Sequence, residues 1–172
     1  MDIVTCIEGR TSVRSFKADP VDDETVVQAL TMANLAPSAG NLQARDFVIV
    51  RNAKTKRLLM EAALRQDFIA SAPVVVVCCA NLERIEHYRE RGAKLYCLLD
   101  VAAAIENMIL FLHSKGLGTV WVGAFDEQKA SEALGLPAHV RPVAIVPIGV
   151  PAGRAVHRSR LPIGDMIHYE KW

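Results

Sequence analysis

The sequence of 172 residues lacks a dominant charge, a targeting segment and a long membrane-spanning stretch. Its 20 lysines and arginines nearly balance 19 aspartates and glutamates, so the formal net charge is only +1. This balance argues against broad nucleic-acid binding, which needs a basic surface. No signal peptide opens the chain, and no apolar stretch is long enough to cross a membrane. We therefore expect a cytoplasmic protein whose partners include neither nucleic acid nor membrane.

Cysteine is scarce as well: there are four, at positions 6, 78, 79 and 97. Their spacing fits no metal-binding motif, so no metal site is expected. Cys78 and Cys79 lie within an apolar run, where a free thiol behaves as a small hydrophobic group. We interpret all four thiols as reduced, as is usual in the cytosol. A catalytic or redox-active thiol is the alternative that the sequence leaves open.

What the chain has in abundance is apolar residues, which make up 51% of it. The length suits a single domain over residues 1–172, and such an apolar excess suggests burial at a subunit interface. Residues 151–172 differ from the rest because they combine prolines, glycines and arginines with an apolar and aromatic ending. We expect this segment to be an arm that packs either on its own domain or on a partner subunit.

Apolar periodicity predicts a chain in which helices and strands alternate, which is a mixed α and β class. Asp22 is a predicted helix N-cap, and Pro37 limits that helix to about Asn34. The expected helices cover residues 3–8, 22–34, 54–65, 100–115 and 127–134. The expected strands cover residues 47–50, 74–77, 119–122 and 143–148, and the β-branched run 74–77 is typical of a central strand covered on both faces.

The helix predicted over residues 100–115 is apolar on nearly every face, which indicates burial all round. In a chain of this size such burial needs atoms from another subunit, so this helix is a candidate dimer core. Gly116 ends it, as a glycine after a helix commonly does. Glu106 and Asn107 lie within the apolar surface and need polar partners.

Two clusters of arginine lie near opposite ends of the chain. Arg10 and Arg14 flank Ser12, while Arg158 and Arg160 flank another serine. The planar guanidinium group donates two parallel hydrogen bonds and is well suited to phosphate. If the clusters converge in space they would form one phosphate site; otherwise they are ordinary exposed charges.

Two loops rich in small residues accompany these clusters. The first, Ala-Pro-Ser-Ala-Gly-Asn-Leu-Gln at 36–43, is either a surface that a planar ligand can approach closely or an ordinary loop. The second, residues 115–125, has three glycines between a helix and a strand. It is not the dinucleotide-binding fingerprint, whose glycines follow a strand and open a helix.

Taken in order, these motifs resemble the FMN-dependent nitroreductase family of NAD(P)H:flavin-type oxidoreductases. The resemblance covers nearly the whole chain. It includes Arg-Thr-Ser-Val-Arg-Ser-Phe at 10–16, the loop at 36–43, Asp-Val-Ala-Ala-Ala-Ile-Glu-Asn-Met at 100–108 and Gly-Leu-Gly-Thr-Val-Trp-Val-Gly-Ala-Phe at 116–125. It continues through Pro-Ile-Gly-Val-Pro at 147–151, Arg-Ser-Arg-Leu-Pro at 158–162 and the ending His-Tyr-Glu-Lys-Trp.

The resemblance implies an α+β fold of three layers, α/β/α, around a mixed and mostly antiparallel sheet. In this family each subunit's C-terminal arm, here residues 151–172, adds a strand to the sheet of its partner. The homodimer binds two FMN molecules at its interface. The cofactor-binding residues that the resemblance implies are Arg10, Thr11, Ser12, Arg14, Pro37, Ser38, Ala39, Asn41, Gln66, Gly123, Arg158 and Arg160.

Each of these residues has an implied role. The phosphate would be held by the two clusters, through Arg10, Ser12, Arg158 and Arg160. Arg14 would lie near N1 and O2 of the flavin, and Gln66 would read the edge of its pyrimidine ring. The loop 37–41 would come from the partner subunit. Thr11 and Ala39-Gly40 depart from the commoner residues, and the stretch 81–99 leaves only a short lid over the active site.

The implied activity is reduction of small acceptors such as nitroaromatics or quinones with electrons from NADH or NADPH. No side chain in the motifs is an evident acid or base, so the flavin N5 carries the chemistry while Arg14 tunes the ring. Donor and acceptor would alternate on one open face, which predicts ping-pong kinetics. The alternatives are flavin fragmentation, reductive dehalogenation, and a flavin-binding protein without turnover.

Overall fold

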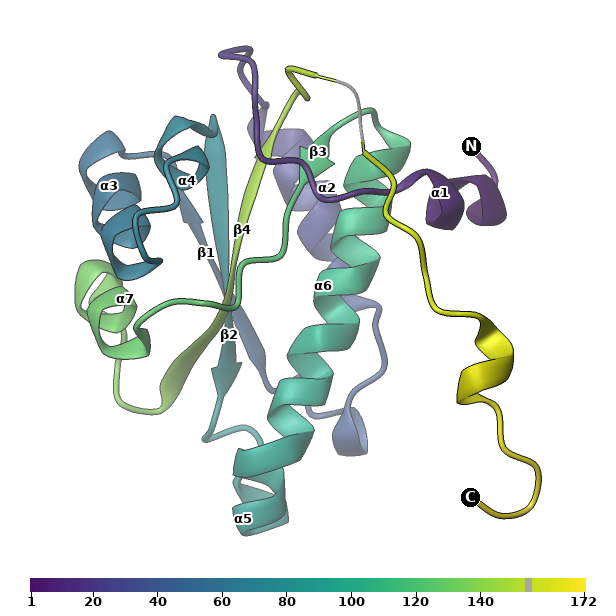
Figure 1. The fold of residues 1–172 in the computed structure, drawn as a ribbon. Helices are drawn as coiled ribbons and strands as arrows, with labels where there is room; N and C mark the ends of the chain where they lie inside the picture. The colour runs from purple at the N-terminus through teal and green to yellow at the C-terminus, as the bar shows by residue number, and fades with distance from the viewer. Residues whose placement is uncertain (154–155) are drawn as a thin grey trace.

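The computed structural model describes residues 1–153 and 156–172, and it has three layers with a sheet in the middle (Figure 1). The four strands are antiparallel and lie in the order β1-β2-β4-β3. They are β1 Arg45–Val50, β2 Val74–Asn81, β3 Gly118–Thr119 and β4 Val140–Gly149. A parallel bridge between Ser12 and Thr119 adds the N-terminal segment to the edge of the sheet. The predicted three-layer α+β fold with a mostly antiparallel mixed sheet is confirmed.

The helices divide between the two faces of the sheet (Figure 1). On one side lie α1 Ile3–Gly9, α2 Asp23–Asn34 and α6 Cys97–Ser114. On the other lie α3 Ala53–Ala62, α4 Phe68–Ser71 and α7 Glu127–Leu134. A short helix, α5 Arg89–Arg91, precedes α6. Helix α6 is the longest of these helices and runs along the layer that it shares with α1 and α2 (Figure 1).

Strand β2 is buried on both faces, as its β-branched run predicts. Side chains alternate along it: Val74 and Val76 pack in the core beneath α2 and α6, whereas Val75 and Val77 pack beneath α3 and α7. The doublet Cys78–Cys79 follows the same alternation, one thiol in each core. The two cores thus meet across a single strand.

The helix boundaries that were predicted from capping residues are confirmed. The Asp22 carboxylate accepts a hydrogen bond from the backbone N–H of Thr25 at 2.6 Å, and α2 ends at Asn34. Gly116, with φ of 79°, follows the end of α6 in the left-handed conformation. Asn107, which needed a polar partner, donates to the backbone carbonyl of Met32 at 3.3 Å.

Two elements are shorter than expected. Helix α3 ends at Ala62 because Leu64 and Arg65 adopt the left-handed conformation, with φ of 56° and 59°. The predicted strand 119–122 stops at Thr119 and resumes only as an isolated bridge between Val122 and Ile145. Both differences lie where tertiary contacts, rather than apolar periodicity, determine the backbone.

Helix α6 differs from its expectation in two ways. It begins at Cys97 and follows directly on the helical turns from Glu86, and this combined stretch of 29 residues is apolar and long enough to cross a membrane. The prediction that no such stretch exists is therefore wrong by length and composition, although 44% of its most apolar window is buried inside the protein. The prediction that this helix is buried on every face is also wrong for a single chain. Leu99 is 55% exposed, and Glu106 lies at the surface.

The arm leaves the body of the molecule (Figure 1). Residues 156–172 are exposed throughout, and within the described part of the chain they form hydrogen bonds only with one another. The alternative that the arm packs on its own domain therefore finds support only at Pro151 and Ala152, which contact Phe16 and Ser15, and none in residues 156–172. Its packing on a partner subunit stays a prediction.

Candidate functional site

The first arginine cluster is fixed to the edge of the sheet. Arg10 ends α1, where its backbone N–H donates to the carbonyl of Cys6 at 3.1 Å. The chain then runs extended, and the N–H of Val13 donates to the carbonyl of Thr119 at 2.8 Å. A Cβ atom on Gly118 would lie 2.8 Å from the side chain of Val13, so this close approach requires glycine.

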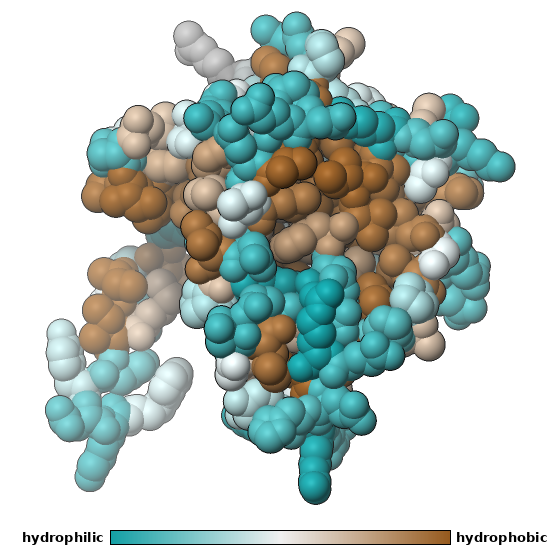
Figure 2. Space-filling view, turned by 180° about the vertical axis from the view of Figure 1, so that it is seen from behind, coloured by the Kyte–Doolittle hydropathy of each residue, from teal (hydrophilic) through white to brown (hydrophobic). Residues whose placement is uncertain are grey.

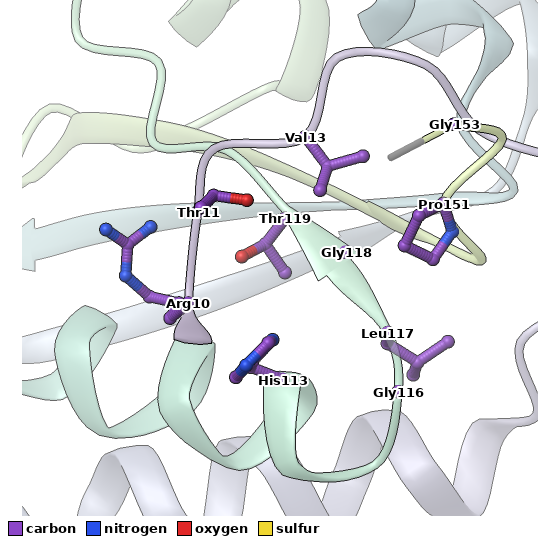
Figure 3. Close-up of a pocket in the computed structure, with 10 residues that line it drawn as sticks. All are labelled: Arg10, Thr11, Val13, His113, Gly116, Leu117, Gly118, Thr119, Pro151 and Gly153. Carbon is purple, nitrogen blue, oxygen red and sulfur yellow. The ribbon is translucent and has the colours of Figure 1, made fainter. Parts of the chain in front are cut away.

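Behind this segment lies a cavity of about 160 Å³, shown in Figure 3. Arg10, Thr11 and Val13 line it, together with residues of the α6–β3 connection and of the turn after β4. Ser12 and Arg14 do not line it and are exposed. Because side chains alternate along the extended segment after α1, Thr11 and Val13 face the cavity, whereas Ser12 and Arg14 face outward. Arg10 also lines the cavity, but it is the C-cap residue of α1 and does not belong to this alternation.

His113 is a residue of this cavity that the sequence analysis missed. Figure 3 shows its imidazole between Arg10 and Leu117, and the Nε2 atom lies against Gly9. Partial burial lowers the pKa of His113, and the charges of Arg10 and then His157 lower it further. These effects favour the neutral form of the imidazole. Its position in the last turn of α6, before Gly116, was the available signal.

The second arginine cluster lies in the arm. Arg158 and Arg160 are both exposed, and Arg160 Nη1 donates to the carbonyl of Arg158 at 3.4 Å. No hydrogen bond or ion pair among residues 1–153 and 156–172 connects them with Arg10 or Arg14. One chain alone does not bring the two clusters together.

The loop 37–41 has a defined backbone. Gly40 and Asn41 adopt the left-handed conformation, with φ of 57° and 55°. The Ser38 hydroxyl oxygen accepts the N–H of Gln43 at 3.0 Å, and the N–H of Ala39 donates to a carboxylate oxygen of Asp100 at 2.9 Å. Meanwhile Pro37 and Asn41 are exposed. Hydrogen bonds to Asp100 and Gln43 therefore hold the loop, while Pro37 and Asn41 remain exposed.

Arg45 is a second contributor that sequence reasoning missed. It begins β1, is only 3% exposed, and binds backbone carbonyls around the loop. Burial lowers its pKa, and the nearby charge of Asp100 opposes that shift. In sequence it stands between Ala44 and Asp46 and looks like a surface arginine, so no pattern distinguished it.

Gln66 and Gly123, which are 57 positions apart, are brought to one place. The Gln66 amide donates to the carbonyl of Ala63 at 3.0 Å and to that of Ala124 at 3.4 Å. Gly123 is exposed, and a Cβ atom there would meet only Trp121, at 4.0 Å. The chain itself therefore leaves space over Gly123, beside an amide whose carbonyl oxygen can accept a further hydrogen bond.

The cysteines are all free and buried. Burial raises the pKa of the Cys79 thiol to about 12, and it raises that of Cys78 well above its usual range. A thiol in this state is a poor nucleophile, since the thiolate is the reactive form. The alternative of a reactive thiol finds no support at the doublet. Among the described residues no group of His, Cys, Asp or Glu could hold a metal ion.

The candidate residues occupy opposite ends of α6. Asp100, near its beginning, contacts the loop 37–41, while His113, near its end, lines the cavity beside Arg10. Thirteen residues of α-helix separate them, which is about 20 Å at 1.5 Å per residue. One chain therefore presents two separate half-sets of the predicted cofactor contacts.

Comparison with known proteins assigns the family. The model of the nitroreductase family matches residues 7–66 and 57–150. An NADH dehydrogenase of Thermus thermophilus is 33% identical over 195 residues, covering 97% of this chain and 95% of that protein. An FMN reductase [NAD(P)H] of Bacillus subtilis is 29% identical over 185 residues, covering 99% of this chain and 74% of that protein.

The fold agrees with these relatives. The structure of NfrA2 from B. megaterium superposes with a TM-score of 0.93 at 26% identity, covering 100% of this chain and 76% of that one. The family match spans most of the sequence, including the first arginine cluster, the loop 37–41 and the α6–β3 connection. The chain belongs to the nitroreductase family.

Proposed function

We propose that this protein is an FMN-dependent NAD(P)H oxidoreductase that reduces small electron acceptors, such as nitroaromatics or quinones, as a homodimer in the cytoplasm. Membership of the nitroreductase family makes the chain an oxidoreductase enzyme, and its relatives include an NADH dehydrogenase and an FMN reductase. The observation that carries the finer proposal is the placement of two half-sets of cofactor contacts at opposite ends of α6.

The phosphate end fits the chemistry of FMN. Within the described residues no hydrogen bond or ion pair uses the guanidinium groups of Arg10 or Arg14, so both keep their donors for a ligand. Exposed Ser12 lies between them. Several arginine donors that converge on a dianion replace its hydration with charge-assisted hydrogen bonds. In the proposed site Arg158 and Arg160 of the arm complete this group.

The ring end also fits. Space over Gly123 allows a planar ring to lie against the backbone, and the Gln66 amide beside it can accept a hydrogen bond from a ring N–H. Arg14, on the outward face of the first cluster, is proposed to lie near N1 and O2 of the flavin. A positive charge there favours the reduced anionic ring, which raises the tendency to accept hydride.

The loop 37–41 is proposed to act on the flavin of the second subunit, because it lies about 20 Å along α6 from Arg10. A dimer surface is available. Figure 2 shows apolar side chains gathered on the side where α2 lies, framed by polar ones. A groove of about 340 Å³ between α1, α2 and α6 is lined by Ile3, Met32, Leu35, Leu110 and Phe111 among others. Such a patch is typical of a subunit interface.

The bound flavin supplies hydride transfer at its N5 atom. The residues of this chain orient and hold it, and none of the proposed contacts is an obligatory acid or base. With one open face, NAD(P)H and the acceptor bind in turn, which gives ping-pong kinetics. The buried free thiols agree with the proposed cytoplasmic location.

An absorption spectrum and anaerobic titrations with NADH and NADPH test the proposal. We expect a yellow protein that NAD(P)H bleaches and that nitro or quinone substrates restore. Oxygen-dependent loss of the flavin without reduction of those acceptors would instead indicate flavin fragmentation. Halide release from a halogenated aromatic acceptor would indicate reductive dehalogenation, and flavin that binds but is not reduced would indicate a protein without turnover. Failure to bind FMN would contradict the proposal.

A further inference from the structure

Arg45 forms a hub of hydrogen bonds beneath the loop 37–41. Its Nη2 atom donates to the carbonyls of Asn34 at 2.9 Å and Ala36 at 2.8 Å. Its Nη1 atom donates to the carbonyls of Pro37 at 3.4 Å and Asp100 at 3.1 Å. One side chain thus connects the end of α2, the start of the loop and the first turn of α6.

A guanidinium group so deeply buried is expensive unless its charge is compensated. The nearby carboxylate of Asp100, itself 4% exposed, opposes the effect of burial on the pKa of Arg45, although among the described residues the two side chains share neither an ion pair nor a hydrogen bond. The Asp100 Oδ1 atom accepts the N–H of Ala39 at 2.9 Å, so the carboxylate holds the middle of the loop while Arg45 holds its beginning. Among the described residues, Arg45 Nε and Asp100 Oδ2 have no hydrogen-bond partner. Such a penalty suggests that the pair has a purpose beyond filling the core.

We propose that Arg45 and Asp100 are positioning residues that set the loop 37–41 in its binding conformation before the flavin and the second subunit meet it. This inference rests on the proposed function. A loop with left-handed backbone at Gly40 and Asn41 would otherwise sample many conformations. Fixing it in advance removes the loss of conformational freedom on binding, which is the general basis of preorganisation.

The chain offers a matched control. Lys56 in α3 is another buried cation, 8% exposed, whose Nζ atom donates to the carbonyl of Ala72 at 2.6 Å. Helix α3 lies on the other face of the sheet (Figure 1), and among the described residues no hydrogen bond or ion pair joins the Lys56 side chain to the loop. Loss of Lys56 should therefore disturb stability without disturbing the loop.

The test compares FMN binding by Arg45→Met, Lys56→Met and wild-type dimers, using quenching of FMN fluorescence. Thermal unfolding of each apoprotein measures the general loss of stability. We expect Arg45→Met to raise the FMN dissociation constant by roughly tenfold or more, and Lys56→Met to change it by less than about twofold. The visible spectrum of bound FMN should move toward that of free FMN only in Arg45→Met.

Milder variants keep the test decisive if Arg45→Met does not fold. Arg45→Lys keeps the positive charge but loses the planar guanidinium group with its several donors. Asp100→Asn keeps an oxygen that can accept the N–H of Ala39 but loses the negative charge. Both should weaken FMN binding less than Arg45→Met and more than Lys56→Met. Equal weakening in the Arg45 and Lys56 variants, in proportion to lost stability, would overturn the inference. Unchanged FMN affinity in all of these variants would also overturn the inference, but it would leave the proposed function intact. Wild-type protein that binds no FMN would overturn both the inference and the proposed function.

Discussion

The two ends of α6 differ in how completely one chain satisfies them. At its beginning, Asp100 and Arg45 each form one hydrogen bond to the loop 37–41, at Ala39 and Pro37, and Arg45 forms three more to the carbonyls of Asn34, Ala36 and Asp100 around it. At its end, His113 and Arg10 line a cavity, and residues 156–172 of the arm, which carry Arg158 and Arg160, have no hydrogen bond to the body among the described residues; only the start of the arm does, where the N–H of Ala152 donates to the carbonyl of Ser15 at 2.9 Å. One chain therefore holds the loop end in place by its own hydrogen bonds. We propose that a ligand and a partner subunit complete the arginine end.

In the proposed homodimer, this contrast would let two identical sites be shared between the two subunits. A rigid loop can be presented to another chain because it keeps its shape alone. Arginines that are held close together repel one another, so the cluster is most stable when an anion binds and neutralises its charge. The first end is therefore expected to respond to mutations in its packing, and the second to changes in the ligand or the arm.

Removal of the arm should have the largest effect. A chain that ends at Pro151 loses the segment proposed to add a strand to the partner's sheet, so we expect a monomer where the full chain is a dimer. Light scattering coupled to size exclusion measures the mass of both. A truncated protein that stays dimeric would show that the groove between α1, α2 and α6 suffices for association and that the arm has another role.

Arg160→Ala should have the next largest effect. If this side chain holds the phosphate, FMN binding weakens by about 1.5–3 kcal/mol, the scale of a hydrogen bond to a charged group. Riboflavin, which has the same ring but no phosphate, is the control ligand, and its binding should not change. An equal loss for riboflavin would place Arg160 away from the phosphate.

Gly40→Val probes the loop 37–41, at the beginning of α6. The residue has φ of 57°, and a Cβ atom there would lie 2.7 Å from the Tyr88 hydroxyl, so valine must distort the loop. We expect FMN binding to weaken about tenfold. Gly135→Val is the control, because Gly135 also has a left-handed backbone, with φ of 63°, but open space around it at the end of α7. Equal losses in both variants would attribute the effect to general strain.

His113→Gln should have the smallest effect, on the pH dependence of stability. Because the pKa of His113 is lowered in the folded protein, the unfolded chain takes up its proton first as pH falls. The free energy of unfolding of the apoprotein should therefore decrease from about pH 6.5 downward, and the variant should show a flatter profile. Urea unfolding at several pH values measures it. His87→Gln, an exposed histidine before α6, controls for loss of an imidazole as such.

Much of the fold was predictable because local signals decide it. The Asp22 cap, the β-branched run 74–77 and the helix 127–134 all appear as expected, since each depends on neighbours in sequence. The short β3 strand and the early end of α3 were not predictable. Their limits depend on where Thr119 and Ala62 meet distant backbone, through Val13 and Asp126 respectively.

Candidate site residues could be named from the sequence only where residue type is chemically specific, and their binding roles stay predictions. Arginines beside serine indicate phosphate, and the Pro-Ser-Ala-Gly-Asn loop accompanies them in the family. Arg45 and Asp100 escaped notice because a buried pair and an exposed pair look alike in sequence. His113 escaped for a similar reason: only the fold brings it beside Arg10. The resemblance implied that one site is shared between subunits, which stays a prediction.

Mixed dimers test the central claim most directly, namely that each flavin site combines the arginine end of one chain with the loop end of the other. One chain carries Arg10→Ala and Arg14→Ala, the other carries Gly40→Val, and different affinity tags isolate the heterodimer. One of its two sites then receives both defects and the other receives none. The account predicts one FMN per heterodimer bound with wild-type affinity, although both parent homodimers bind weakly. A heterodimer that binds FMN as weakly as its parents would contradict it, because each site would then lie within a single chain.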